Sequence, residues 1–446
     1  MSVDITAFHP VAYAAGFFGR FYKSGTSSRI GRQSYEMPKK TILLLCAGAV
    51  FITFAVCMMA KDNSEAPFII CVDDSLFPIY ESSIVTLQNE NVGVEFEIIR
   101  VPMAGEQENS AREEMLLKIR SDIIAGRGPD VFLNYILAYN PNINNNLFPD
   151  TVKAIEAGTF VSLENIKNTN NIQSNCLSQL LKATEFKGEN YVFTLQFILH
   201  GLFAPKTDAS TVLASVKNPL EWAAMIDKIY DTEIGYKYVA SDITRFSPPF
   251  LDYENRRLNY DREWLIEWAA VLDSQNNDVS CSNIIEGPAS PLALAVVADT
   301  VQQPTFHPMP NHIDGTTAII TAYMAVSATC RNLDIASDFF EHVKRVSATL
   351  PGDAVASYTM DSVANETGII QQQECLKTMV SSVGRKNIAP LLQDVLNASH
   401  VISIAVFRDN PICVLPNILF EKRRDGELLG ECASEVYRWF SRYVSE

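Results

Sequence analysis

The stretch Gly-Arg-Gly-Pro-Asp at residues 126–130 constrains the fold most, because it turns the chain from a helix into a strand. Residues 111–124 before it repeat apolar side chains at the spacing of one helical stripe. Gly126 is typical of a helix end, and Pro129 prevents the helix from continuing. Residues 131–133 form a short apolar run, which fits a strand buried on both faces. The stretch therefore predicts a helix followed directly by an inner strand.

Predicted strands and helices alternate along the first half of the chain. Residues 67–72 form a continuous apolar run, and residues 94–99 alternate apolar and acidic side chains as a half-covered strand does. Later buried strands are predicted at residues 292–298 and 317–326. Helical patterns occupy residues 219–230, 263–272, 332–346, 371–383 and 431–443. This order predicts an α/β fold with parallel strands, arranged as two lobes and a helical C-terminal region.

The two glycines of residues 126–130 do not form a phosphate loop. Such a loop needs glycines after a strand and before a helix, where backbone N–H groups and the helix dipole face the anion. Here the glycines follow a helix, whose C-terminus presents carbonyl oxygens and partial negative charge. No Gly-Lys-Ser or Gly-Lys-Thr follows. The motif therefore predicts a structural turn.

The charge of the chain is unevenly distributed. The formal net charge is −16. Residues 1–40 carry six basic and two acidic side chains and residues 41–60 carry none, which leaves −20 for residues 61–446. A body this acidic repels nucleic acid and anionic lipid, so we expect no nucleic-acid partner.

Residues 41–60 form an uncharged apolar run between Lys40 and Lys61. As a helix, a run of about 20 residues is long enough to cross the hydrocarbon core of a membrane. The basic excess lies on its N-terminal side, so we expect that side in the cytoplasm and the body outside. The run is therefore predicted to be one N-terminal transmembrane or signal segment.

The start of the chain is compatible with more than one type of anchor. Residues 1–36 are too long for the charged leader of a signal peptide, so we interpret them as a disordered upstream extension and expect translation to begin at Met37. Residues 37–64 then comprise the signal or anchor segment and a spacer. Cys57 ends a stretch similar to a bacterial lipobox, although Val56 replaces the usual small residue, and Cys57 is a candidate for lipidation. Cleavage, a retained helix and a lipid anchor all stay open.

No sequence motif points to a metal, a cofactor or a catalytic centre. The nine cysteines contain no Cys-x-x-Cys pair and the six histidines no His-x-x-x-His pair, so zinc and thioredoxin-type chemistry have no support. Gly-x-Ser-x-Gly and His-Glu-x-x-His are absent as well. We therefore expect a binding protein without a cofactor rather than an enzyme.

Six short motifs follow one another across roughly residues 65–345. They are the helix–turn–strand unit at residues 116–133 and the segments 157–163, 187–193, 218–222, 306–310 and 325–340. In this order they resemble the extracellular solute-binding proteins of the ABC-transporter family, in the carbohydrate-binding branch known as family 1. Thr194 replaces a proline that is usual there, and residues 201–206 replace a Tyr-Asn-Lys segment. The last hundred residues resemble the family only in being helical.

The resemblance implies a two-lobed, periplasmic-binding-protein-like fold whose chain crosses between lobes near residues 195–203 and 300–308. The expected lobes are residues 65–200 with 304–346 (lobe 1) and residues 201–303 with 347–446 (lobe 2). Such a receptor captures a small molecule, here a carbohydrate, between its lobes and delivers it to an ABC permease. Ligand binding closes the lobes by a hinge motion. The expected location is the extracytoplasmic face of a bacterial cell membrane.

Ligand contacts are expected just after parallel strands, because the crevice of an open α/β sheet lies at their carboxyl ends. Two aspartates follow the first predicted strand, and an amide and a tyrosine follow the strand at residues 131–133. An aromatic and a histidine near the second crossing are expected to face them across the cleft. Amides and carboxylates suit sugar hydroxyl groups, and aromatic rings suit the face of a sugar. The candidate ligand-binding residues are Asp73, Asp74, Asn134, Tyr135, Phe306 and His307.

Four other side chains are expected to serve the fold. Asp130 lies at the helix-to-strand corner, where a carboxylate commonly accepts backbone N–H groups. Trp222 begins an amphipathic helical pattern. Trp264 and Trp268 are four residues apart, the spacing of a core-facing helical stripe.

Two other functions could use the same fold. A glycoside-acting enzyme needs two carboxylates several ångströms apart on different elements, which adjacent pairs such as Asp73 and Asp74 do not provide. A membrane-tethered sensor or adhesion domain keeps the cleft but needs no permease. The sequence favours the transport receptor and leaves both alternatives open.

Overall fold

The computed structural model describes residues 66–103, 109–137, 145–166, 178–205, 221, 251–274, 285–288, 303–311, 315–349, 369–370, 388–409 and 428–445. The chain divides into the compact units Met1–Phe68 and Ile69–Glu446, and the fold described below is that of the second unit. Several predicted features lie outside the described residues, namely residues 1–36, the apolar run at 41–60 with Cys57, the elements at 292–298 and 371–383, and Trp222.

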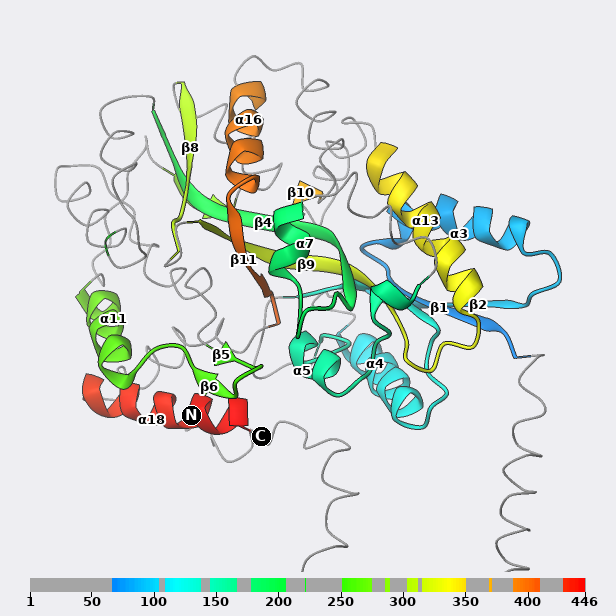
Figure 1. Cartoon of the computed structure of the whole chain (residues 1–446), viewed down its shortest axis with the longest axis horizontal. Helices are drawn as coiled ribbons and strands as arrows, with labels where there is room; N and C mark the ends of the chain where they lie inside the picture. Colours follow the sequence, from blue (N-terminus) through cyan, green and yellow to red (C-terminus); the bar gives the residue numbers. More distant parts are fainter. Residues whose placement is uncertain are drawn as a thin grey trace, which may run out of the picture. The chain divides into compact units, whose positions relative to one another are not determined.

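The described elements are labelled in Figure 1. The strands are β1 (Phe68–Asp73), β2 (Phe96–Val101), β3 (Val131–Tyr135), β4 (Val192–Pro205), β5 (Leu251–Asp252), β6 (Arg257–Leu258), β7 (Ile285–Pro288), β8 (Pro304–Pro308), β9 (Thr316–Val326), β10 (Ile369–Ile370) and β11 (Ile402–Phe407). The helices are α3 (Phe77–Glu90), α4 (Asn109–Ile124), α5 (Thr151–Glu156), the 3-10 turn η2 (Leu163–Asn165), α7 (Ser178–Ala183), α11 (Arg262–Ser274), α13 (Leu333–Thr349), α16 (Ile388–Ser399) and α18 (Leu429–Ser445).

The main sheet is mixed. Its order is β10-β4-β9-β3-β1-β2, with β11 paired to β9 and with β7 and β8 paired to β4. β1 is parallel to β3 and β11 is parallel to β9, but β9 is antiparallel to both β3 and β4. The predicted α/β class is confirmed, whereas the prediction of parallel strands is wrong at the centre of the sheet. An apolar run predicts a buried strand, but strand direction depends on how the chain returns to the sheet.

Both faces of the sheet are covered. Phe193 and Thr194 are consecutive in β4, so their side chains point to opposite faces. The ring of Phe193 meets the ring of Phe340 in α13 at 4.9 Å between centroids, and α13 packs against α3. On the other face Tyr323, which is paired with Thr194, meets the ring of Phe160 at 6.2 Å. The apolar core therefore extends through the sheet to both layers.

The corner at residues 126–130 has the predicted structure. α4 ends at Ile124, and Gly126 has a left-handed φ of 71°, which glycine adopts without the steric cost of a Cβ atom. Arg127 N–H donates to the Asp122 carbonyl at 2.8 Å, and Gly126 N–H donates to the Ile123 carbonyl at 3.0 Å. This pair of bonds is the Schellman motif, which satisfies carbonyls at the helix end. β3 follows at once.

Asp130 holds three segments together, which confirms its predicted structural role. Its buried carboxylate accepts the Ile69 N–H of β1 at 2.8 Å and the Arg331 N–H, beyond β9, at 2.9 Å. The Arg331 guanidinium lies 3.3 Å from the same carboxylate. The residue that ends the helix-to-strand corner thus fixes the start of β1 against the end of β9.

β4 continues from one part of the sheet into another. Residues 192–199 pair with β9, and residues 200–205 pair with β7 and β8. In Figure 1, β4 runs alongside β9 and then beside β8. The two predicted crossings overlap β4 and β8, while the division into lobes stays a prediction.

Gly201 allows β4 and β8 to approach closely. A Cβ atom at this position would lie 2.2 Å from the His307 carbonyl oxygen and 2.6 Å from the Phe306 ring. We expect Gly201→Ala to force the strands apart and to lower the free energy of unfolding by about 3 kcal/mol. Urea unfolding of the full chain, followed by intrinsic fluorescence, measures this change. Gly430→Ala is the control, because a Cβ atom there meets nothing within 4 Å; equal unfolding midpoints for the two variants would contradict the close approach.

Candidate functional site

The carboxyl ends of β1 and β3 lie side by side. The two strands are parallel, and their register pairs Val72 with Leu133. The next residue along each strand, Asp73 and Asn134 respectively, therefore lies at the same edge of the sheet. The structure thus brings together two of the candidate ligand-binding residues.

A third strand end meets this edge from the opposite direction. β3 and β11 pair with the same side of β9, β3 antiparallel and β11 parallel. Just beyond the two strands, Ile136 N–H donates to the Thr321 carbonyl at 2.7 Å and Arg408 N–H donates to the Ile320 carbonyl at 3.1 Å. β3 and β11 therefore point toward each other at consecutive residues of β9. We call this place the strand-end junction, made of Asp73, Asn134, Ile136, Thr321 and Arg408.

Asp73 forms a buried ion pair with Arg112. The carboxylate lies 2.8 Å from the Arg112 guanidinium, and both side chains are almost fully buried. Arg112 also donates to the carbonyls of Pro102 and Asn145, and Asp73 accepts the Ser75 N–H at 2.9 Å. Burial raises the pKa of Asp73, and the Arg112 guanidinium opposes this effect. In the described conformation Asp73 therefore holds the end of β1 against the first turn of α4.

Asp74 is more accessible. Its carboxylate lies 2.6 Å from Arg100 and keeps 26% of its side-chain surface exposed. Arg100 in turn covers the ring of Phe77 at 4.0 Å from the centroid. Asp74 can thus exchange its partner for a ligand at little structural cost, since exposed ion pairs contribute little stability.

Asn134 and Tyr135 are buried inside the sheet. They pair with Tyr323 and Ala322 of β9, respectively. Asn134 is 4% exposed and Tyr135 is 2% exposed. In the described conformation neither side chain is open to solvent, so a ligand would reach them only after a movement of the elements that cover the junction.

Phe306 and His307 lie in β8, away from the strand-end junction. They pair with Phe203 and Leu202 in the second half of β4, roughly 30 Å along that strand from Thr194. The Phe306 ring packs on the Phe203 ring at 5.0 Å between centroids. His307 Nε2 lies 2.9 Å from Thr305 Oγ1, and burial lowers its pKa while Asp394 opposes this effect. The role of all six candidates as ligand contacts stays a prediction.

A second group of polar side chains was not predicted. Asp150 caps the start of α5, where it accepts the Lys153 N–H at 3.1 Å. The hydroxyl groups of Tyr253 and Tyr443 both donate to its other oxygen, at 2.7 Å and 2.6 Å. The three partners of this carboxylate thus come from different parts of the fold: α5, the turn of the β5–β6 hairpin and α18.

Asp409 completes this group. Its Oδ2 atom accepts the Thr151 N–H at 3.0 Å and the Thr151 hydroxyl at 2.6 Å. The Thr151 hydroxyl also lies 3.3 Å from the hydroxyl of Tyr323 in β9. Asp409 is fully buried. We call the whole group the buried carboxyl cluster, made of Asp150, Thr151, Tyr253, Tyr323, Asp409 and Tyr443.

Part of the buried carboxyl cluster has a sequence signal. Asp150 followed by Thr151 suits a helix N-terminus, because Asp is a favoured N-cap residue. The partners at Tyr253, Asp409 and Tyr443 are more than a hundred residues away, and nothing in their local sequence marks them as partners of α5. Only the tertiary fold brings them together.

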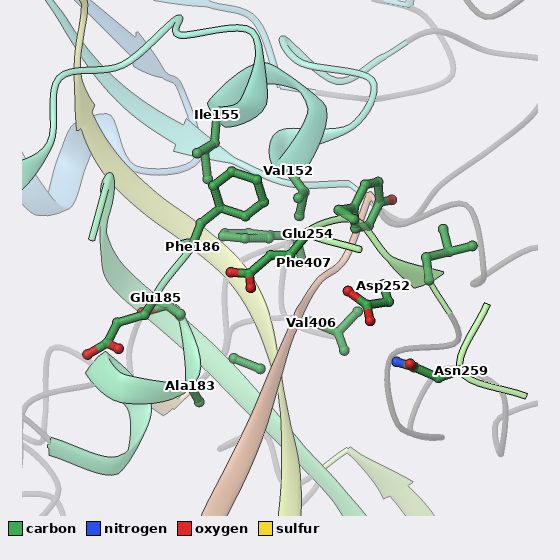
Figure 2. A pocket seen from close by; sticks show the side chains of 14 residues that line it. Val152, Ile155, Ala183, Glu185, Phe186, Asp252, Glu254, Asn259, Val406 and Phe407 are labelled. Carbon is green, nitrogen blue, oxygen red and sulfur yellow. The ribbon is translucent and has the colours of Figure 1, made fainter. Parts of the chain in front are cut away.

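A pocket of about 210 Å³ lies next to the buried carboxyl cluster. Figure 2 shows the rings of Phe186 and Phe407 among the aliphatic side chains of Val152, Ile155 and Val406. The other lining residues are Ala183, Thr184, Glu185, Leu251, Asp252, Tyr253, Glu254, Asn259 and Ala405. By the predicted lobe division its wall comes from both lobes.

Two carboxylates of the pocket already serve neighbouring turns. Asp252 accepts the Asn255 side chain at 2.8 Å and lies 3.1 Å from Arg257, while Glu254 accepts the Lys187 N–H at 2.6 Å. The pocket thus offers mainly an apolar surface. Within the described ranges, no group of three or more Cys, His, Asp or Glu residues is placed to hold a metal ion. No helix in those ranges combines the length and apolar character needed to cross a membrane.

The comparison with known proteins rests on structure alone. No protein-family model matches the sequence, and no curated protein sequence matches it. An extracellular solute-binding protein of family 1 from Alicyclobacillus acidocaldarius matches 86% of this chain and all of its own, with a TM-score of 0.53 and 10% identity. A periplasmic oligogalacturonide-binding protein from Yersinia enterocolitica matches 84% of this chain and 98% of its own, with a TM-score of 0.51 and 11% identity. A de novo designed esterase matches 85% of this chain and 99% of its own, with a TM-score of 0.54 and 10% identity.

These likenesses identify the fold as the mixed α/β fold of the periplasmic binding proteins. The resemblance that six sequence motifs indicated is thereby confirmed at the level of the fold. The chain is also similar in fold to a structure that is named as an esterase. The fold alone therefore does not decide between a binding protein and an enzyme.

The two adjacent aspartates provide a matched test of the site geometry. Asp73→Asn leaves the Arg112 guanidinium buried without a carboxylate, and we expect it to lower the free energy of unfolding by about 3 kcal/mol. Asp74→Asn breaks an exposed pair and should cost less than about 1 kcal/mol. Urea unfolding of the full chain measures both. Equal losses would contradict the assignment of Asp73 as the buried structural partner.

Proposed function

We propose that this chain is an extracellular receptor that captures a carbohydrate between two lobes and delivers it to an ABC permease. The observation that carries the proposal is the likeness in fold to a solute-binding protein over 86% of the chain and the full length of that protein. Carbohydrate is the favoured ligand class because another structure of the same fold is named as an oligogalacturonide-binding protein.

The proposed cleft lies at the strand-end junction. Strand ends of open α/β sheets form ligand crevices, and here β1, β3 and β11 all end at this place. Asp74 offers a partly exposed carboxylate to sugar hydroxyl groups. Asp73, Asn134 and Tyr135 are buried beside it, so their contact with a ligand requires the lobes to open. Phe306 and His307 lie in β8, away from the junction, so they stay predicted ligand contacts outside this proposed cleft.

The body is proposed to face the outside of a bacterial cell, held at the membrane by residues 41–60 or by a lipid on Cys57. This anchor keeps a captured sugar close to the permease. The acidic charge of residues 61–446 disfavours anionic ligands, because like charges repel. A tethered sensor or adhesion domain would share the cleft but not the permease.

The buried carboxyl cluster is the one observation that favours a second function, a glycoside-acting enzyme. Asp150 and Asp409 come from different elements, as the two carboxyl groups of a glycosidase do. However, both are buried, and their oxygens accept hydrogen bonds from Tyr253, Tyr443 and Thr151. The binding receptor is therefore preferred.

Thermal unfolding of the full chain in mild detergent, with a panel of oligosaccharides, tests the receptor. Maltotriose and trigalacturonate serve as neutral and anionic sugars, with spermidine and a tripeptide as non-sugar controls. A sugar at a hundred times its Kd adds about 2.7 kcal/mol to the stability of the folded state, which raises Tm by a few degrees. We expect a shift with a sugar, with intact sugar recovered after prolonged incubation.

Asp74→Asn should weaken the binding of that sugar about tenfold, because one charge-assisted hydrogen bond is worth at least about 1.5 kcal/mol. Asp338→Asn, at an exposed position of α13, is the control and should bind normally. Sugar fragments in the incubation would favour the glycoside-acting enzyme. The absence of any shift with a sugar would exclude these sugars as ligands and favour the sensor or adhesion domain.

A further inference from the structure

The buried carboxyl cluster joins elements that are distant in the sequence. Asp150 at the start of α5 accepts a hydroxyl group from Tyr253 in the β5–β6 hairpin and another from Tyr443 in α18. Lys153 of α5 adds a bond from its Nζ to the Tyr443 carbonyl at 2.7 Å, and its ammonium group lies 4.0 Å from the centre of the Tyr443 ring. One carboxylate therefore bonds both the hairpin and α18 to α5, within an apolar cluster that also includes Ile155, Leu251 and Phe440.

Asp409 brings a second acidic group into the same dry environment. It is 0% exposed, and its Oδ1 atom has no hydrogen-bond partner among the described residues. Its Oδ2 atom binds Thr151, the residue that follows Asp150. Two carboxyl groups thus share the start of one helix, and the cost of ionising both is high because water cannot screen their repulsion.

Three basic side chains lie on the elements around the cluster: Lys153, Arg256 and Arg408. Lys153 extends from α5 to the Tyr443 ring and carbonyl, on the side of Asp150. Arg408 precedes Asp409 in the chain and is buried as well. On the hairpin, Arg256 reaches Glu156 at the end of α5, at 3.3 Å and with 61% of its side chain exposed. Asp409 Oδ1 accepts no hydrogen bond among the described residues, whereas both oxygens of Asp150 accept hydrogen bonds.

We propose that the buried carboxyl cluster is a proton-operated latch. With a proton on Asp409, the cluster holds the β5–β6 hairpin and α18 against α5, and loss of that proton releases them. By the predicted division, α5 belongs to lobe 1 and the hairpin and α18 belong to lobe 2. As a regulator of lobe movement the latch rests on the proposed function, but as a contact between elements it does not.

The direction of the pH effect follows from the two carboxyl groups. Burial raises the pKa of Asp409 well above its ordinary value, and the charge of Asp150 raises it further; burial raises the pKa of Asp150 as well. The folded chain therefore binds these protons more tightly than the unfolded chain, in which an aspartate has a pKa of about 3.9. The latch is fully closed below about pH 4 and weakens as the pH rises through the folded-state pKa of Asp409.

Hydrogen–deuterium exchange of the full chain at pH 5 and pH 8, corrected for the intrinsic exchange rate, tests the latch without any ligand. Peptides that cover α18 and the β5–β6 hairpin report on its two arms, and a peptide of α13 is the internal control. We expect the protection of both arms to fall at least tenfold between pH 5 and pH 8. The protection of α13 should stay constant.

Three variants separate the latch from general loosening. Asp409→Asn cannot ionise but keeps an oxygen that accepts the Thr151 N–H, so both arms should stay protected at both pH values. Tyr443→Phe removes the bond from α18 to Asp150 and keeps the Lys153 bond to the backbone carbonyl of residue 443. We therefore expect α18 to lose part of its protection at both pH values, while the hairpin, held by Tyr253, keeps its own. Asp338→Asn on α13 should behave as the native chain does.

Two results would overturn the latch. One is equal protection of α18 in the native chain at pH 5 and pH 8. The other is a pH effect in Asp409→Asn as large as in the native chain, which would assign the proton to a different group. Neither result depends on sugar binding, so a failure of the latch is distinct from a failure of the receptor.

Discussion

The pairing of β9 with its three neighbours is the constraint on which the rest of the structure depends. All eleven side chains of β9 are buried, so this strand has no position that tolerates a change of register. Along one edge it pairs with β4, and along the other it pairs with β3 and then β11. The strand-end junction exists because β3 and β11 pair with the same edge of β9. Tyr323 of β9 also contacts Thr151 through its hydroxyl group, which links β9 to the start of α5.

Local patterns in the sequence were sufficient for part of the elements, whereas α3, α16 and β11 were not predicted. The Schellman turn at Gly126, the strands β1 and β3, and the helices α4, α11, α13 and α18 follow from apolar spacing, glycine and proline. Strand direction did not follow, because a central strand is equally apolar whether it runs parallel or antiparallel to its neighbours. The lobe boundaries depend on contacts even farther apart in the sequence. No local break marks a boundary in β4, which is one unbroken strand of fourteen residues.

For the candidate site, the rule that ligands bind at strand ends correctly placed Asp73 beside Asn134. The rule could not reveal that Asp73 forms an ion pair with Arg112, because Arg112 comes from α4. The other partners of Arg112, Pro102 and Asn145, come from loops. The buried carboxyl cluster was not predicted for the same reason. Asp150 has the local signature of a helix cap, and the contacts that give it a second role come from residues far along the chain.

Shifted pKa values in buried carboxyl groups are a frequent sign of an active site, but they also arise in structural networks. The geometry distinguishes the two cases here. A catalytic pair must reach the scissile bond of a substrate, whereas Asp409 is fully buried and Asp150 accepts bonds from two tyrosines and a backbone N–H. What these bonds join is α5, the β5–β6 hairpin and α18. A buried group that links three elements and is inaccessible to substrate acts on the arrangement of those elements. Asp150 and Asp409 resemble a hydrolytic pair in number and in origin, but their contacts favour a role in controlling the movement of the elements around the cleft.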